Sequence, residues 1–459
     1  MLSSKASYEK KELSYYSTSQ VRFKFLPFYD LYTVKKMDNR FKDILERNVG
    51  HSKKVLRKLI FASFTLGINV TAPSRAKDSL KLINIFLLLC AVFGIYGQYC
   101  YVMLHIHEPI TEYIECFYET LQLSISLIKL TYCLFIQRRI YELLHAAETG
   151  EIIGQCEVFD MGKKQKNLQI LNEVADILHY SWLIIRRQLV IYSCLIAVIC
   201  ALFFFVGLST YPYNKFIGPA NYTLQAAFPS YFPILESKGF AFPYFELQYI
   251  IPCVEVYVSG MGAFCFDSIF IVLTVHGTAL LRILHVIIRY STHQSIKPQQ
   301  RVIYLRHCIL HFQRTYKYYD DINSLYGVVS LSQFGTIVFI LGMVLFQANI
   351  ALDDDIKIFI KMVSHFSASC FEVFLYCFNG QRLTTESEKL NFSWYDCDWY
   401  QESKEFKELI KMMILRSNRI MLITVSGFTS MSLMTFLSII NTSGSYFLML
   451  KNTLSYNKE

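Results

Sequence analysis

The sequence predicts an all-α membrane protein with seven transmembrane helices, a cytoplasmic N-terminus and an extracellular C-terminus. The first observation is composition: of 459 residues, 53% are hydrophobic and only 18% are charged, which is too apolar for a set of soluble domains. The second is a series of apolar runs close to the roughly 20 residues that a helix needs to cross a bilayer. The third is a one-sided distribution of basic residues between these runs.

Seven runs have the length and composition of membrane spans. The second contains Glu115, Glu119 and Lys129, and the fourth continues past Asp267, so it is too long for the bilayer and predicts an extension beyond it. An amphipathic segment at 404–425 precedes the seventh run. In chain order the runs are Leu82–Leu104, Tyr113–Ile136, Leu189–Leu208, Leu247–Ile288, Val328–Ile350, Ile356–Phe378 and Ser432–Leu450.

Basic residues orient these spans, because cytoplasmic loops are enriched in Lys and Arg. The segments on one side hold 35 Lys and Arg, whereas those on the other side hold 4. We therefore expect the N-terminus in the cytoplasm and, since the number of spans is odd, the C-terminus outside. The long second outer loop then contains Asn221, which begins an Asn-Tyr-Thr glycosylation acceptor. The basic side comprises 1–79, 137–187, 277–327 and 381–411.

The formal charge of +9 is located in the N-terminal segment, since residues 1–79 hold 16 Lys and Arg against 7 Asp and Glu. A basic segment on an apolar chain favours contact with anionic membrane lipid, and we do not expect nucleic acid as a partner. The polar first 20 residues lack the apolar core of a signal peptide. The segment Lys53–Ile68 combines basic and apolar faces and is expected to lie on the inner leaflet.

Other classes of seven-span or catalytic protein fit poorly. A G-protein-coupled receptor would have the opposite orientation and proline-kinked late helices, but no proline follows Pro298. A transporter would show two related halves, and the spans show no such pairing. The pair His307 and His311 has helical spacing that could hold a metal, yet no framework completes it. Without nucleotide-binding or hydrolase motifs, we expect no enzyme, no cofactor and no metal site.

The stretch at 378–400 reads FNGQRLTTESEKLNFSWYDCDWY, with Gly380, Leu383 and Ser387 in a Gly-x-x-Leu-x-x-x-Ser pattern before a Tyr and Trp pair. The chain later ends its last span in SGSYFLML at 443–450. Both stretches, together with Asp267 in the fourth span, resemble the insect odorant receptor family. The predicted inverted topology agrees with this resemblance across nearly the whole chain.

The resemblance implies an odorant-gated, non-selective cation channel in the plasma membrane of olfactory sensory neurons. The chain would be a ligand-specific subunit that assembles with the odorant receptor co-receptor as a heterotetramer. In this frame 1–79 is a cytoplasmic segment, and 80–378 holds helices one to six, with a pocket for small volatile odorants in their outer halves. Residues 379–430 belong to a cytoplasmic helical anchor, and 431–459 form the pore-lining seventh helix with a short extracellular tail.

Two alternatives stay open. Gustatory receptors end in Thr-Tyr, five hydrophobic residues and Gln-Phe, whereas this chain reads Ser445-Tyr446 and then departs again at Lys451 to Thr453. These departures favour an odorant receptor over a gustatory receptor. A gustatory-receptor-like channel that assembles from one kind of subunit is the second hypothesis. A metabotropic receptor is the third.

Candidate pocket residues are aromatic or flexible side chains in the outer halves of the spans, since apolar pockets bind small volatiles by excluding water. On this basis we select Phe117, Tyr118, Leu121, Phe203, Phe204, Tyr257, Met261, Phe346 and Phe366.

In the last span, small and polar residues that include Ser445 recur near helical spacing, which fits either a pore lining or a tightly packed helix. The resemblance favours the pore and places Met449 at a hydrophobic gate and Asn452 at an outer polar ring. Lys451 departs from the family pattern, which usually has an apolar residue at this position. A lysine amine at the pore mouth would repel cations.

Charges inside spans are costly and need a partner. For Glu115 and Glu119 two interpretations stay open, an interfacial position near water or the lining of a vestibule. Asp267 is expected to form a structural ion pair with either Arg282 or Lys129.

Overall fold

The computed structural model describes residues 39–68, 78–108, 110–161, 164–216, 229–236, 242–354 and 356–456. One compact unit begins at Asn39 and is separate from Met1–Asp38. Most of the basic N-terminal segment and the predicted glycosylation site at Asn221 lie outside the described residues.

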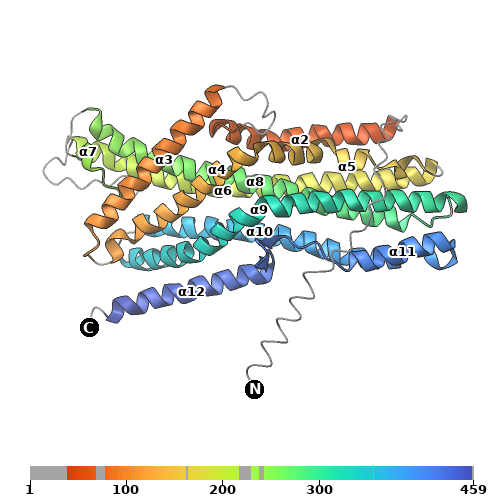
Figure 1. Ribbon diagram of the computed structural model, residues 1–459. Helices are drawn as coiled ribbons and strands as arrows, with labels where there is room; N and C mark the ends of the chain where they lie inside the picture. Colours follow the sequence, from red (N-terminus) through yellow and green to blue (C-terminus); the bar gives the residue numbers. More distant parts are fainter. Residues whose placement is uncertain are drawn as a thin grey trace, which may run out of the picture. The chain divides into compact units, whose positions relative to one another are not determined.

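The described unit is helical apart from one two-stranded hairpin (Figure 1). Strand β1 (Thr424–Val425) pairs antiparallel with β2 (Thr429–Ser430). The helices are α2 (Asn39–Thr65), α3 (Asp78–Leu104), α4 (Ile110–Thr149), α5 (Glu151–Gly154), η2 (Glu157–Asp160), α6 (Lys164–Phe216), α7 (Pro233–Glu236), α8 (Tyr244–Arg289), α9 (Pro298–Asp354), α10 (Ile356–Tyr395), η3 (Trp399–Gln401), α11 (Lys404–Ser417) and α12 (Leu433–Tyr456).

Seven of the described helices are long and apolar enough to cross a membrane, which confirms the predicted number. They are α3, α4, α6, α8, α9, α10 and α12. Several are much longer than their apolar runs predicted: α6 has 53 residues and α9 has 57. At 1.5 Å per residue such helices reach about 80 Å, against about 30 Å of hydrocarbon. The first predicted run, Leu82–Leu104, agrees with the structure at both ends. Helices α6 and α9 extend beyond their predicted runs, because hydropathy marks where apolar sequence stops while these helices continue with an amphipathic pattern.

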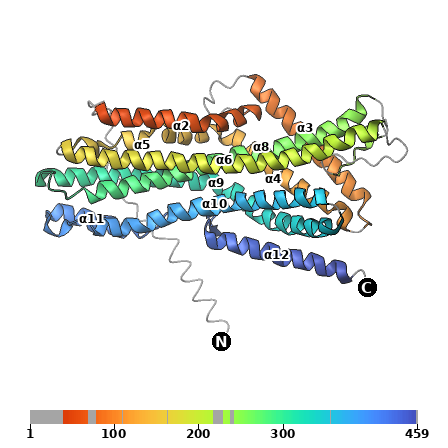
Figure 2. The same ribbon diagram turned by 180° about the vertical axis from the view of Figure 1, so that it is seen from behind.

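Helix α8 lies at the centre of the bundle, where α3, α4, α6, α9 and α10 all contact it. Every side chain from Gly262 to Leu281 is buried, as expected for a helix that is apolar on all faces. Figure 2 shows α6 and α9 running beside it, while α3 crosses the bundle obliquely. The core of the protein is therefore built around α8.

The two ends of the bundle are formed by different elements. We call the end with α11 the α11 end, and the end with α7 and the α3–α4 and α9–α10 turns the α7 end (Figure 1). At the α11 end, Arg282 of α8 donates to Glu386 of α10 at 2.9 Å, and Arg306 of α9 donates to Glu405 of α11 at 2.5 Å. Burial and a hydrogen bond to Glu173 also raise the pKa of Tyr290 there. The amphipathic segment that the sequence predicted at 404–425 thus contributes helix α11 to this end.

The Gly-x-x-Leu-x-x-x-Ser stretch joins α10 to the segment that leads into α12. A Cβ atom at Gly380 would overlap the backbone oxygen of Met431, so only glycine permits this close approach. Leu383 is fully buried, and Ser387 accepts a hydrogen bond from the Met421 backbone N–H at 2.9 Å. No break in α10 marks the boundary at 378/379 expected between the spans and the anchor.

Substitution of Gly380 by alanine is expected to destabilise the protein by about 1–3 kcal/mol, because the new methyl group forces backbone apart. The measurement is the melting temperature of the detergent-purified protein. Gly335→Ala is the matched control: a Cβ there meets nothing within 4 Å, and alanine favours helix by up to about 1 kcal/mol. Equal melting temperatures for the two variants would contradict the close approach.

Candidate functional site

A cavity of about 70 Å³ lies between α4, α6, α8 and α10. Its wall is largely apolar on α6 and α8, where Ile196, Phe203 and Val256 line it. On α4 and α10 the wall is polar, with Glu119 and His365. A small apolar cavity with a few converging polar groups is typical of a site for a small molecule.

Two carboxylates of α4 face two bases of α10 toward the α7 end. Glu115 and Glu119 are one helical turn apart, as are Lys361 and His365, so the pairs form two rungs. Lys361 donates to Glu115, and His365 Nδ1 lies 3.5 Å from Glu119 Oε1. Both glutamates are more than nine-tenths buried. The structure therefore places them inside the bundle rather than at a solvated edge, and Glu119 faces the cavity.

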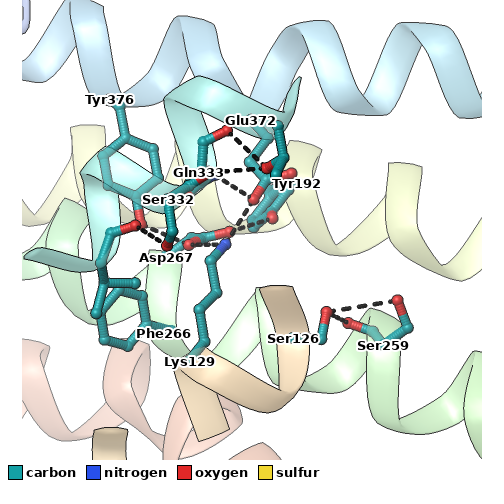
Figure 3. A network of polar contacts seen from close by, with 12 residues as sticks. Ser126, Lys129, Tyr192, Ser259, Phe266, Asp267, Ser332, Gln333, Glu372 and Tyr376 are labelled. Atoms are coloured by element: carbon teal, nitrogen blue, oxygen red, sulfur yellow. Dashed lines mark hydrogen bonds and ion pairs between the residues drawn. The ribbon is translucent and has the colours of Figure 1, made fainter. Parts of the chain in front are cut away.

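A network of buried polar side chains forms the floor of the cavity (Figure 3). Lys129 Nζ donates to Asp267 Oδ1 at 2.8 Å and to Glu372 Oε1 at 2.6 Å. The hydroxyl groups of Tyr192 and Tyr376 donate to the two oxygens of Asp267 at 2.7 and 2.6 Å. The predicted pairing of Asp267 with Lys129 is confirmed, whereas Arg282 pairs with Glu386 instead.

This network ties five helices together at one level of the bundle. Gln333 of α9 donates to Glu372 at 2.6 Å, which adds α9 to the helices that supply the lysine, the aspartate and the tyrosines. Tyr192 and Glu372 also line the cavity, so the cavity and the network share side chains. Two buried carboxylates share one lysine, so the hydrogen bonds donated by Tyr192, Tyr376 and Gln333 are needed to stabilise their remaining negative charge.

Helix α12 packs against α9 and α10 through one stripe of its surface. Ile439 and Ser443 are buried, and the ring of Tyr446 lies edge-on to Phe339 at 5.3 Å between centroids. Gly342 of α9 makes room for this ring, because a Cβ there would lie 2.5 Å from it. Phe436 makes a similar contact with Phe374 of α10. Two of the five helices of the network, α9 and α10, thus also hold α12.

The predicted pore residues lie on exposed parts of α12. Ser445 donates its hydroxyl back to the Asn441 carbonyl at 3.1 Å, so the residue remains compatible with an apolar or a wet surface. Met449 is 54% exposed, and Lys451 and Asn452 are exposed as well. The polar face of α12 is not covered by the described part of this chain.

The candidate pocket residues fall into three environments. Phe203 lines the cavity, and Phe204 packs beside it against Val256. Phe117 is 45% exposed on the surface of α4. The remaining candidates contact the main core away from the cavity wall: Tyr118, Leu121, Tyr257, Met261, Phe346 and Phe366. Sequence reasoning left Glu119 between an interfacial position and the lining of a vestibule, and it missed His365, because it sought aromatic or flexible side chains for the pocket.

The two histidines of α9 have different neighbours. His311 is buried with its Nε2 3.4 Å from the Leu280 carbonyl, and His307 lies 3.6 Å from Glu157. Within the described ranges no group of three or more His, Cys, Asp and Glu side chains could hold a metal ion.

Seven apolar helices, among them the buried central α8, with a cavity between four of them, define a multi-pass membrane protein. The family model described as "7tm Odorant receptor" matches residues 109–444. The chain therefore belongs to the odorant receptor family, which is a family of receptors and not of enzymes.

Individual relatives agree with this assignment. Odorant receptor 63a of Drosophila melanogaster is 34% identical over 400 residues, which cover 86% of this chain and 95% of that protein. Odorant receptor 67b of the same species is 26% identical and covers 91% of this chain and 99% of its own length. The insect olfactory receptor OR5 from Machilis hrabei, solved with eugenol, has the same fold, with a TM-score of 0.68 at 12% identity over 91% of this chain and all of its own.

Proposed function

We propose that the chain is the ligand-specific subunit of an odorant-gated, non-selective cation channel that works with the odorant receptor co-receptor as a heterotetramer. The observation that carries the proposal is the exposed polar face of α12. The uncovered face of this membrane-spanning helix also carries Asn441, beside Ser438 and Ser445, and a carboxamide exposed to lipid is costly, so that face favours water or a neighbouring subunit. A central pore shared with other subunits supplies both.

In this proposal the α7 end faces the outside and the α11 end faces the cytoplasm of an olfactory sensory neuron. Asn221 is then on the side where glycosylation occurs. The hydrophobic Met449 closes the pore by excluding water, with Asn452 and Lys451 at its outer mouth. The α11 end forms the anchor between subunits.

The cavity is the proposed odorant site, with Phe203 and the other candidates of its neighbourhood around it. Ligand binding between α4, α6, α8 and α10 changes the packing of Tyr192 and Glu372 at the floor. Through Gln333 and Tyr376 the network connects this floor to α9 and α10, which hold α12. A population shift of these packed helices would then move the pore helix.

Expression with and without the co-receptor tests the proposal. We expect odorant-evoked cation current only when both are present. Current from this chain alone would favour the gustatory-receptor-like homomeric channel. A response that requires a G protein and carries no current of its own would exclude both channel hypotheses.

A further inference from the structure

Glu119 differs from the other carboxylate that lines the cavity. Glu372 is fully engaged, because Lys129 and Gln333 both donate to its Oε1. In contrast, Glu119 Oε1 has no hydrogen-bond partner among the described residues, although the residue is only 8% exposed. An unsatisfied carboxylate oxygen in a buried position is costly and attracts a donor.

His365 adds a second unsatisfied atom at the same place. Its Nδ1 also has no hydrogen-bond partner in the described ranges, and the residue is 6% exposed. The 3.5 Å between this nitrogen and Glu119 Oε1 is too long for a good hydrogen bond. A group that lies beside both atoms could donate to the carboxylate and also contact the imidazole.

The nearest strong cation does not satisfy Glu119. Lys361 donates to Glu115, one turn away, and its amine lies 4.8 Å over the ring of Phe203. The opposite wall of the cavity is apolar, with Ile196, Ile199 and Val256. The cavity thus combines a polar acceptor with an apolar wall that can contact a short hydrocarbon chain.

We propose that the cavity selects small ligands whose head group donates a hydrogen bond, namely a hydroxyl or an amino group, held by Glu119 beside His365. This inference rests on the proposed odorant site and specifies its ligand class. An alcohol can donate to the carboxylate and accept from the imidazole, whereas a ketone leaves the carboxylate unsatisfied. Sites that hydrogen-bond a donor discriminate strongly against analogues that lack it.

Propan-2-ol, propan-2-amine and propanone test the proposal, because they share a three-carbon skeleton that suits a cavity of about 70 Å³ and differ in the head group. In the full channel with its co-receptor, we expect half-maximal activation by the alcohol or the amine at a concentration about 10- to 100-fold lower than by the ketone. Glu119→Gln should reduce this preference about tenfold if the hydroxyl is the natural head group. It should abolish the preference if the head group is a charged amine, since the compensating charge is lost.

Glu255→Gln is the matched control, because it removes the charge of a buried carboxylate that lies outside the cavity wall and pairs with the uncharged Gln98. We expect it to leave the ratio between the three probes unchanged. Thermal stabilisation of the purified complex by each probe measures binding without gating. Equal stabilisation or activation by all three probes, or equal loss of preference in both variants, would overturn the proposed ligand class. Probe-evoked current without head-group preference would still support the channel function, so the two failures are distinguishable.

Discussion

Replacement of Lys129 by methionine is expected to destabilise the protein by about 3–5 kcal/mol, because removal of one partner of a buried ion pair leaves uncompensated charge. Lys129 is 1% exposed, and it donates to both Asp267 and Glu372. Methionine preserves most of the side-chain volume, so lost packing contributes little. The melting temperature of the purified channel and its ligand-evoked current should both fall.

The triple variant Lys129→Met, Asp267→Asn, Glu372→Gln separates charge from packing. It removes all three charges and keeps one oxygen at position 267 that can accept from Tyr192 or Tyr376, while the amide NH2 of the new asparagine can donate to the hydroxyl oxygen of the other tyrosine. We expect it to recover most of the stability, since replacing a whole buried ion cluster is often nearly neutral. A single Lys129→Met variant that melts like the parent would show that the lysine does not hold the network together.

Substitution of Met449 by serine is expected to produce cation current in the absence of ligand. A hydrophobic constriction closes a pore by expelling water, and a hydroxyl group at the constriction lets water remain. Leu448→Ser is the matched control, because Leu448 is similarly exposed, at 55% against 54%, but lies about 100° around the helix. Constitutive current in both variants, or in neither, would place the gate elsewhere.

The sequence was most informative for features that depend only on residues close together in the chain. Apolar runs such as Leu82–Leu104 and Ser432–Leu450 predicted the number of spans, because the bilayer requires a minimum length of apolar helix. The ends of α6 and α9 could not be predicted in this way, since their extensions are stabilised by contacts between helices rather than by lipid. Asp267 was recognisable as a charge that needs a partner.

Which partner Asp267 takes depends on three-dimensional packing. Lys129 and Arg282 were both candidates, and only the assembled bundle shows that Arg282 pairs with Glu386 instead. The cavity could not be located for a similar reason. Its polar side combines Glu119 with His365, which are distant in the chain, and no periodic pattern in a single sequence links residues on two helices.

The central claim is that the exposed polar face of α12 lines the pore, and cysteine substitution tests it most directly. Helix α12 contains no native cysteine, so Ser445→Cys introduces one on the exposed face and Ile439→Cys one on the packed stripe. A charged thiol reagent is applied during ligand-evoked current in the channel with its co-receptor, and the parent measures the background from the native cysteines. If this face lines the pore, we expect the reagent to block the current of Ser445→Cys irreversibly and to change the current of Ile439→Cys no more than that of the parent. Equal block of the two variants, or block of Ile439→Cys alone, would contradict it.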